Sequence, residues 1–371
     1  MSKMNVLHLI YSLHTGGAEK VIENYSKFHD RNFFKPIVCS ITDGGIIVDE
    51  IKKTGTDVFL LNKKGMFDVS AVLRLARIIK SQNIHIVHVH NFSANFWGTI
   101  TAVLCGVRFI VRTEHSIINK RKSLFRIKYF INSLLDIFQK KIICVSEEVR
   151  SVHVKRNTLS PKKYITIYNG VDSRIFNDSY ETSKYFKEFN IEAGCKIVVK
   201  IASLTSHKGH EYFLRAAKKV LDEEKKVLFI IVGDGPRKDE LTKLAKELGI
   251  KNSVVFTGVR KDINGILKLS DIFVLSSLRE GFPITILEAM AASKPVIVTN
   301  VGGTPEAVIE GATGLIVQPK DEMAMAKAIL LLLRDEKLRQ IMGKKGRERF
   351  EINFKAESMV RKTEDVYRTF V

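Results

Sequence analysis

The sequence predicts an α/β protein of two domains, each built on a parallel β-sheet covered by helices on both faces. The chain has 371 residues, which is long for one average domain and enough for two that each bury a hydrophobic core. Short apolar runs alternate with helical patterns up to residue 168, and the alternation starts again at residue 197. Such alternation is typical of parallel sheets, whose ligands bind at the carboxyl ends of the strands.

The first half begins with an expected strand at Val6–Ile10, followed by a turn with two adjacent glycines, Gly16 and Gly17, that leads into a helix. Adjacent glycines let backbone N–H groups approach a ligand without a Cβ in the way, although a simple tight turn remains the alternative. The G-x-G-x-x-G dinucleotide fingerprint is absent. Further strands are expected at Pro36–Ser40, Val58–Leu61, Ile84–His90, Arg108–Arg112, Lys141–Val145 and Tyr164–Tyr168, with a helix at Val69–Ser81.

Histidines follow two of these strands, in places where a parallel sheet would bind a ligand. His90 ends one strand, and His115 follows the next. A lone histidine is usually structural, but two at adjacent strand ends favour a functional role for His115, whereas for His90 a structural and a functional role are equally open.

The second half starts after the turn Asn169–Asp172 and repeats the alternation. Strands are expected at Ile197–Ile201, Val227–Gly233, Ile272–Leu275 and Val296–Thr299, a further strand ends near Val259, and the chain finishes with helices from Glu322 onward. No sequence repeat relates the two halves.

The segment Ser276–Ala292 carries the strongest chemical signal. A strand leads into a loop that contains Glu280, and Pro283 suits the first turn of a helix that carries Glu288. The N-terminus of a helix favours a phosphate, and carboxylates beside an anion site suit hydroxyl groups. A phosphate flanked by two hydroxyl-binding carboxylates describes a nucleotide sugar. The alternative is a pair of surface glutamates on a helix.

Glu280 and Glu288 form an E-x7-E pair within EGFPITILEAMAASKPVI, which is followed by VGGTPEAV and GATGLIVQP. This segment resembles the donor-binding part of the retaining glycosyltransferases of family 4, and the likeness extends over nearly the whole chain. The resemblance implies the GT-B fold, in which two Rossmann-like domains face a central cleft and a C-terminal helix crosses back to the first domain. It implies an acceptor-binding domain at residues 1–175, with a helix from about 355 to 371, and a nucleotide-sugar donor-binding domain at residues 176–354.

The resemblance also implies roles for individual residues. Glu288 would bind the ribose hydroxyls, Glu280 the hydroxyls of the donor sugar, and Lys208 the diphosphate. Where the family commonly has a second phosphate-binding cation, an arginine, this chain has Ser203, and Arg260 is the candidate to replace it. The implied catalytic residues are Glu280, His115 and Lys208, and the implied donor-binding residues are Glu288, Gly16, Gly17, Ser203, Val259, Arg260, Gly281, Phe282, Pro283 and Ile284.

The expected reaction needs no metal and no cofactor. The sequence contains no D-x-D, the carboxylate pair that holds a divalent metal in the other large glycosyltransferase fold. The family retains the anomeric configuration, and UDP is its most frequent donor nucleotide; the sugar stays open. Two alternatives are a sugar-nucleotide epimerase of related fold and a basic membrane-binding protein without catalysis.

Charge and hydropathy suggest where the protein works. A net charge of +20 implies an anionic partner, and the absence of interleaved aromatic and basic residues argues against nucleic acid. The segment Ile118–Lys141 reads as a basic amphipathic helix that either lies on an anionic membrane or packs on the sheet. No apolar run reaches the ~20 residues of a spanning helix. We therefore expect a cytoplasmic protein, peripheral at the inner face of the plasma membrane, that acts on a saccharide or polyprenyl-diphosphate-linked acceptor in surface polysaccharide synthesis.

Overall fold

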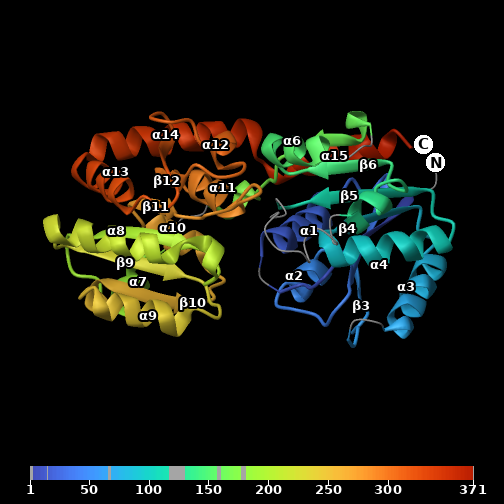
Figure 1. Cartoon of the computed structure of the whole chain (residues 1–371), viewed down its shortest axis with the longest axis horizontal. Coiled ribbons are helices and arrows are strands. Elements are labelled where there is room, and N and C mark those ends of the chain that lie inside the picture. Colours follow the sequence, from blue (N-terminus) through green and yellow to red (C-terminus); the bar gives the residue numbers. More distant parts are fainter. Residues whose placement is uncertain are drawn as a thin grey trace. The chain divides into compact units, whose positions relative to one another are not determined.

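The computed structural model describes residues 3–14, 16–65, 68–116, 130–156, 160–176 and 181–370. The chain forms two compact units, the first made of Met1–Gly170 together with Ala356–Val371 and the second of Val171–Lys355 (Figure 1). Each unit contains one parallel sheet with helices packed on it, which confirms the predicted fold class. The resemblance divided the chain at residues 175 and 354, whereas the units divide after Gly170 and after Lys355.

The sheet of the first unit has seven parallel strands in the order β3-β2-β1-β4-β5-β6-β7. The expected strands in this half are all present, with ends that differ by a few residues. Their bounds are β1 Met4–Ile10, β2 Phe34–Ser40, β3 Asp57–Leu60, β4 Ile86–His90, β5 Phe109–Glu114, β6 Lys141–Cys144 and β7 Tyr164–Thr166.

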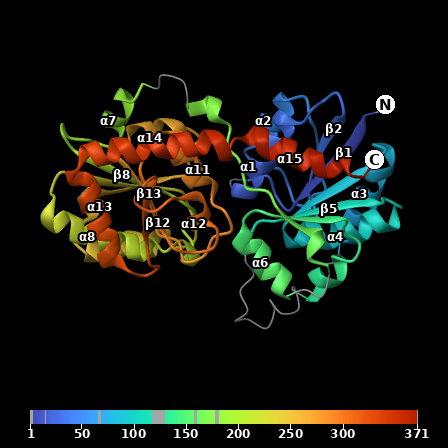
Figure 2. The ribbon, with the colours of Figure 1, turned by 90° about the horizontal axis from the view of Figure 1, so that it is seen from above.

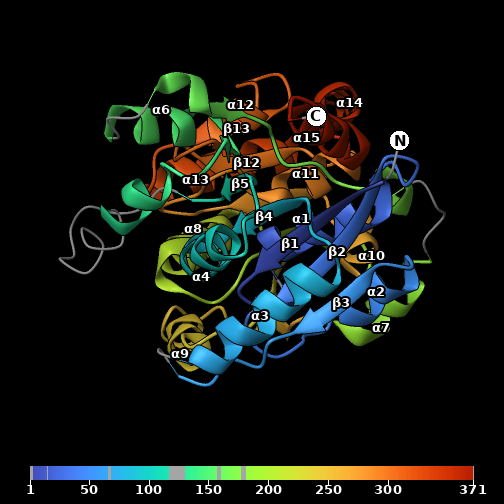
Figure 3. The ribbon, with the colours of Figure 1, turned by 90° about the vertical axis from the view of Figure 1, so that its right-hand side faces the viewer.

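Side chains alternate between the two faces of the sheet, because successive residues of a strand point to opposite sides. On β1 and β4, aliphatic residues such as Leu7, Leu9, Val87 and Val89 form a core with helices α3 (Val69–Ser81) and α4 (Asn91–Leu104). Figure 3 shows these two helices over the strands. The residues that alternate with these aliphatic side chains along β1 and β4 point to the opposite face of the sheet. They include three buried histidines, His8, His88 and His90.

Helix α1 (Gly17–Phe28) and the C-terminal helix α15 (Ala356–Arg368) pack against each other in the first unit (Figure 2). The Tyr25 hydroxyl lies 3.0 Å from the Thr363 hydroxyl, and both side chains are buried. The unit is completed by α2 (Val48–Lys53) and α6 (Glu147–Arg156). The last helix of the chain therefore belongs to the first unit.

The second unit has six parallel strands in the order β10-β9-β8-β11-β12-β13. Their bounds are β8 Lys196–Ile201, β9 Val227–Val232, β10 Val254–Gly258, β11 Ile272–Leu275, β12 Val296–Thr299 and β13 Gly314–Val317. The sequence did not predict β13, whose four residues pair with β12 at the edge of the sheet.

Eight helices with described residues belong to this unit, and α8 and α13 share its hydrophobic core with strands β8, β9 and β11. Their bounds are α7 Ser183–Glu188, α8 His210–Glu223, α9 Lys238–Glu247, α10 Ile263–Leu269, α11 Ile284–Ala291, α12 Thr304–Ala307, α13 Glu322–Arg334 and α14 Glu336–Asn353.

The first half of the expected basic helix at Ile118–Lys141 lies outside the described residues, which omit 117–129. The part that the structure does describe is helical at residues 130–135. Among the described helices, none is both long enough and apolar enough to cross a membrane.

Candidate active site

A buried lysine joins the two loops that follow strands β8 and β11. Lys200 of β8 donates from Nζ to the Lys208 carbonyl oxygen at 2.8 Å and to the Ser276 Oγ at 2.5 Å. Burial, with a contribution from the positive charge of Lys208, lowers the pKa of Lys200 to about 7. Gly209 has a φ of 60°, and a Cβ there would lie 2.1 Å from the Ser276 carbonyl oxygen, so the loops pack too closely for a side chain at this position.

These loops bring Lys208 and Glu280 into contact across 72 residues of sequence. Lys208 Nζ lies 2.7 Å from Glu280 Oε1, and the Ser277 hydroxyl donates to the same oxygen at 2.6 Å. The two side chains are only 19% and 9% exposed, so the ion pair is largely shielded from solvent. The sequence predicted both residues for the site, and the structure places a cation and a carboxylate together there.

A glycine turn after β12 holds the backbone of Glu280. Gly302 has a φ of 54°, and a Cβ there would lie 1.9 Å from the Glu280 carbonyl oxygen. The next residue, Gly303, donates its N–H to the Gly281 carbonyl at 2.9 Å. The turn therefore fixes the position of the Glu280 loop by direct backbone contact, which the sequence did not reveal.

Helix α11 begins immediately after this loop. The first helical residue is Ile284 and Pro283 is the N-cap, whereas the sequence predicted Pro283 within the first turn. Pro283 makes no side-chain hydrogen bond to the first backbone N–H groups of the helix, and the residues from Gly281 to Ile284 are buried. Glu288 is buried and lies just over one turn into the helix.

The remaining residues proposed for the donor are held in different ways. Ser203 is exposed and its hydroxyl lies 3.3 Å from that of Thr205, while Val259 is 50% exposed. Arg260 donates to Asp262 Oδ1 at 2.9 Å and to Oδ2 at 2.8 Å, and it also pairs with Glu188. Its charge is therefore already matched by two carboxylates, and taking a phosphate in place of the missing arginine would require breaking these pairs.

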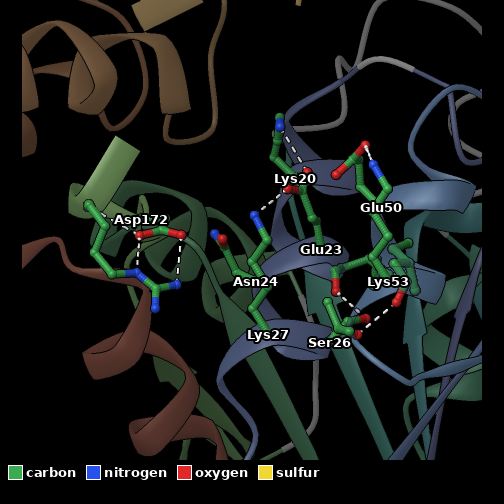
Figure 4. A network of polar contacts seen from close by, with 12 residues as sticks. Lys20, Glu23, Asn24, Ser26, Lys27, Glu50, Lys53 and Asp172 are labelled. Atoms are coloured by element: carbon green, nitrogen blue, oxygen red, sulfur yellow. Dashed lines mark hydrogen bonds and ion pairs between the residues drawn. The ribbon is translucent and has the colours of Figure 1, made fainter. Parts of the chain in front are cut away.

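In the first unit, Gly16 and Gly17 lie at the exposed start of α1, and the N-cap residue is Gly16, which has no side chain to cap the helix. Farther along the helix, Glu23 is buried and accepts from Lys20 at 2.8 Å and from Lys27 at 2.6 Å (Figure 4). Asn24 donates to the Gly170 carbonyl at 2.9 Å. Contacts along the helix thus fix the element that begins at the glycine turn.

His115 and His90 are brought together, as the strand ends predicted. His115 Nε2 lies 3.2 Å from His90 Nδ1. Burial lowers the pKa of His115 to about 4, so its imidazole is neutral at physiological pH.

Within the described residues, His8, His88 and His90 have ring nitrogens within 4.8 Å of one another, a spacing compatible with a metal ion. All six of their ring nitrogens already have hydrogen-bond partners, namely His90 and His29 for His8, Tyr367 and Thr113 for His88, and His8 and His115 for His90. The hydrogen bonds therefore account for this cluster without a metal. Sequence reasoning gave His8 and His88 no role, although both alternate with aliphatic residues along their strands.

Two family models match the chain. The model of Glycosyltransferase Family 4 matches residues 15–174, and that of Glycosyl transferases group 1 matches residues 181–349. The chain belongs to glycosyltransferase family 4.

Two relatives of this family 4 glycosyltransferase match four-fifths or more of the chain. The UDP-Gal:alpha-D-GlcNAc-diphosphoundecaprenol alpha-1,3-galactosyltransferase of Escherichia coli is 27% identical over 382 residues, which cover 99% of this chain and 97% of the relative. The N-acetyl-alpha-D-glucosaminyl L-malate synthase of Bacillus anthracis is 29% identical over 308 residues, which cover 81% of this chain and 79% of the relative. The protein is thus an enzyme of hexosyltransferase type.

The crystal structure of Anabaena HepE in complex with UDP and glucose superposes with a TM-score of 0.88. It is 21% identical and covers 98% of this chain and 99% of its own. This likeness confirms the GT-B fold class for the family 4 glycosyltransferase.

Proposed function

We propose that this enzyme transfers a sugar from a UDP-sugar to a saccharide acceptor carried on a polyprenyl diphosphate, with retention of configuration and without a metal ion. The contact between Lys208 and Glu280 carries the proposal, because it gathers a cation suited to a diphosphate and a carboxylate suited to sugar hydroxyls. The Escherichia coli relative supports the donor nucleotide and the acceptor class, since its name specifies UDP-galactose and a diphosphoundecaprenol-linked GlcNAc.

In this proposal the ion pair opens when the donor binds. Lys208 turns to the diphosphate and, with the backbone N–H groups at the start of α11, stabilises the charge that develops on the leaving group. The Glu280 carboxylate is then available to sugar hydroxyls and orients the anomeric carbon. Glu288 binds the ribose hydroxyls, and His115 contacts a sugar hydroxyl.

The proposed step needs no protein nucleophile. The bond between the anomeric carbon and the phosphate oxygen breaks, and the acceptor oxygen forms its bond on the same face of the sugar. The proton of the acceptor hydroxyl passes to the departing phosphate oxygen, which balances the step. The absence of a D-x-D pair supports the metal-independent form of the proposal.

We also propose that the enzyme works at the inner face of the plasma membrane, where a polyprenyl-linked acceptor is available. Residues 130–140, which lead into β6, expose four large apolar side chains, Phe130, Leu134, Ile137 and Phe138, with exposed fractions between 48% and 63%. An exposed apolar cluster on a protein of net charge +20 suits an anionic lipid surface.

Alanine substitutions at the two glutamates test the donor site. Glu280→Ala should lower turnover by about 10- to 100-fold with little change in UDP affinity, because a hydrogen bond to a charged group is worth about 1.5–3 kcal/mol. Glu288→Ala should weaken UDP binding by a similar factor. Calorimetry with UDP and a UDP-release assay separate the two effects, and Glu322→Ala, in the first turn of α13, is the control. Unchanged kinetics and UDP affinity in both variants would contradict the assigned roles.

The acceptor is tested with a panel of UDP-sugars in the presence of water alone, L-malate or polyprenyl-diphosphate-linked GlcNAc. Transfer only to the lipid-linked acceptor, with an α-linked product by NMR and undiminished rate in EDTA, is the expected result. Transfer to malate would favour a small-molecule acceptor like that of the Bacillus anthracis relative. Conversion of the UDP-sugar into its epimer without any acceptor would instead identify an epimerase.

A further inference from the structure

A chain of hydrogen-bonded imidazoles runs through the first unit from the C-terminal helix to His115. Glu364 Oε1 of α15 lies 2.9 Å from His29 Nδ1. His29 Nε2 lies 3.0 Å from His8 Nε2, and His8 Nδ1 lies 3.4 Å from His90 Nε2. His90 Nδ1 completes the chain at 3.2 Å from His115 Nε2. Each of the three inner histidines uses both ring nitrogens.

The packing of the unit produces this chain. His8 and His90 point away from the aliphatic core because they alternate with its residues along β1 and β4, and His29 follows the end of α1. All three are buried, and Tyr25 stacks on His8 with ring centroids 4.5 Å apart. Buried polar groups need fixed partners, and here the imidazoles supply them to one another.

The histidines of the chain are neutral. Burial lowers the pKa of His8 and His90 well below the ordinary value, with further lowering by neighbouring histidines. Burial also lowers the pKa of His29, against the opposing effect of Glu364. A neutral imidazole has one N–H donor and one acceptor nitrogen, so each histidine can donate in only one direction along the chain.

Glu364 sets that direction. Its Oε1 also accepts the Asp30 backbone N–H at 2.7 Å, so this oxygen acts as an acceptor. His29 must therefore carry its proton on Nδ1 and accept on Nε2. His8 then donates from Nε2 to His29 and accepts on Nδ1. His90 in turn donates from Nε2 to His8 and accepts on Nδ1. At the end of the chain, His115 donates from Nε2–H, and its Nδ1 carries the lone pair.

We propose that Glu364, His29, His8 and His90 are positioning residues that fix His115 as the Nε2–H tautomer and present its Nδ1 as a hydrogen-bond acceptor. An acceptor nitrogen binds a hydroxyl and cannot donate to a phosphate oxygen. His115 thus selects a sugar hydroxyl rather than the diphosphate, and this last clause rests on the proposed function. The C-terminal helix α15 takes part through Glu364, which determines the direction of the hydrogen bonds that end at His115.

Nitrogen-15 NMR of the full-length protein, labelled on histidine and free of substrate, tests the proposal. Long-range proton–nitrogen spectra distinguish the two neutral tautomers, and His115→Gln assigns the His115 signals by their loss. The expected wild-type pattern is protonated Nε2 and unprotonated Nδ1 at His115. A wild-type Nδ1–H tautomer overturns the proposal.

Variants of α15 supply matched comparisons. Glu364→Gln keeps an amide oxygen that can accept the His29 and Asp30 N–H groups, so it should keep the wild-type tautomer. Glu364→Ala removes the acceptor and should give a mixture of tautomers at His115. Tyr367→Phe removes another buried polar contact of the same helix, the one to His88. His88 is not part of the hydrogen-bonded chain that leads to His115, so this variant should leave the His115 tautomer unchanged.

His29→Phe is the second way to cut the chain, for use if Glu364→Ala does not fold. It keeps an aromatic ring beside Phe34 and Tyr367 and should also mix the His115 tautomers. A single Nε2–H tautomer in a folded His29→Phe or Glu364→Ala variant overturns the proposal. With a UDP-sugar, Glu364→Ala should lower turnover on the order of 10-fold without changing UDP affinity, and Glu364→Gln should restore it. If the tautomers are the expected ones but no UDP-sugar is turned over, the hydrogen-bonded chain of histidines stands and the proposed function is rejected.

Discussion

Replacing Gly302 by alanine tests whether the turn after β12 sets the position of Glu280. A Cβ at Gly302 would lie 1.9 Å from the Glu280 carbonyl oxygen, and the residue has a φ of 54°. Gly311 offers a matched control, because its φ is 70° and nothing lies within 4 Å of a Cβ built there. Both alanines carry the strain of a left-handed backbone, and only one meets the Glu280 loop.

The magnitude follows from these distances. Alanine in the left-handed region costs roughly 1–2 kcal/mol, so both variants should lose stability by about that amount. Gly302→Ala must in addition open the contact from 1.9 Å to the ordinary 3.4 Å, which moves the Glu280 backbone or the turn. A displacement of about 1 Å in an oriented group can cost about 100-fold in rate. We therefore expect turnover to fall about 100-fold in Gly302→Ala and to stay near wild type in Gly311→Ala.

The assay combines three measurements on both variants. Thermal unfolding gives the stability change, calorimetry gives UDP affinity, and UDP release from a UDP-sugar gives turnover. UDP affinity should change little, because Glu280 is assigned to the sugar and not to the nucleotide. Equal turnover in the two alanine variants, at comparable stability, would refute the claim that Gly302 positions Glu280.

Two further predictions concern acid and membranes. The buried histidines take up protons more readily when the protein is unfolded, because their folded pKa values lie below the ordinary 6.5. Their contribution to the stability should therefore be full above about pH 6.5 and fall as the pH drops towards the pKa of about 4 for His115. A melting temperature that is equal at pH 7 and pH 5 would contradict this. In a sedimentation assay, Leu134→Glu combined with Ile137→Glu should weaken binding to anionic vesicles by about 10-fold or more, since burying each apolar side chain is worth about 1.5–3 kcal/mol. The control is Ile352→Glu, at a residue of α14 that is 78% exposed, and it should have no effect on vesicle binding.

Periodicity was sufficient to predict most strands, because buried parallel strands read as short apolar runs. β11 and β12 have the predicted bounds, and β8 and β9 differ by one residue. The edge strand β13 was missed because its apolar run, Leu315–Val317, is only three residues long, which is shorter than the runs that indicate a buried strand. Its strand structure comes from pairing with β12.

The candidate site, like the fold, was predicted only in part from the sequence. Glu280 and Glu288 could be chosen from the sequence because the E-x7-E spacing is a local pattern, and the resemblance to family 4 added Lys208. The sequence could not predict that Lys208 would pair with Glu280 or that Gly302 would press on its backbone, since these contacts join different strand ends.

The sequence by itself determined the α/β class and the residue types available for a nucleotide sugar, because hydrophobic periodicity and loop chemistry act over a few neighbouring residues. Only the tertiary structure decided that Glu364, His29, His8, His90 and His115 form one hydrogen-bonded chain. These residues come from separate segments, and a hydrogen bond forms only where folding brings donor and acceptor within hydrogen-bonding distance.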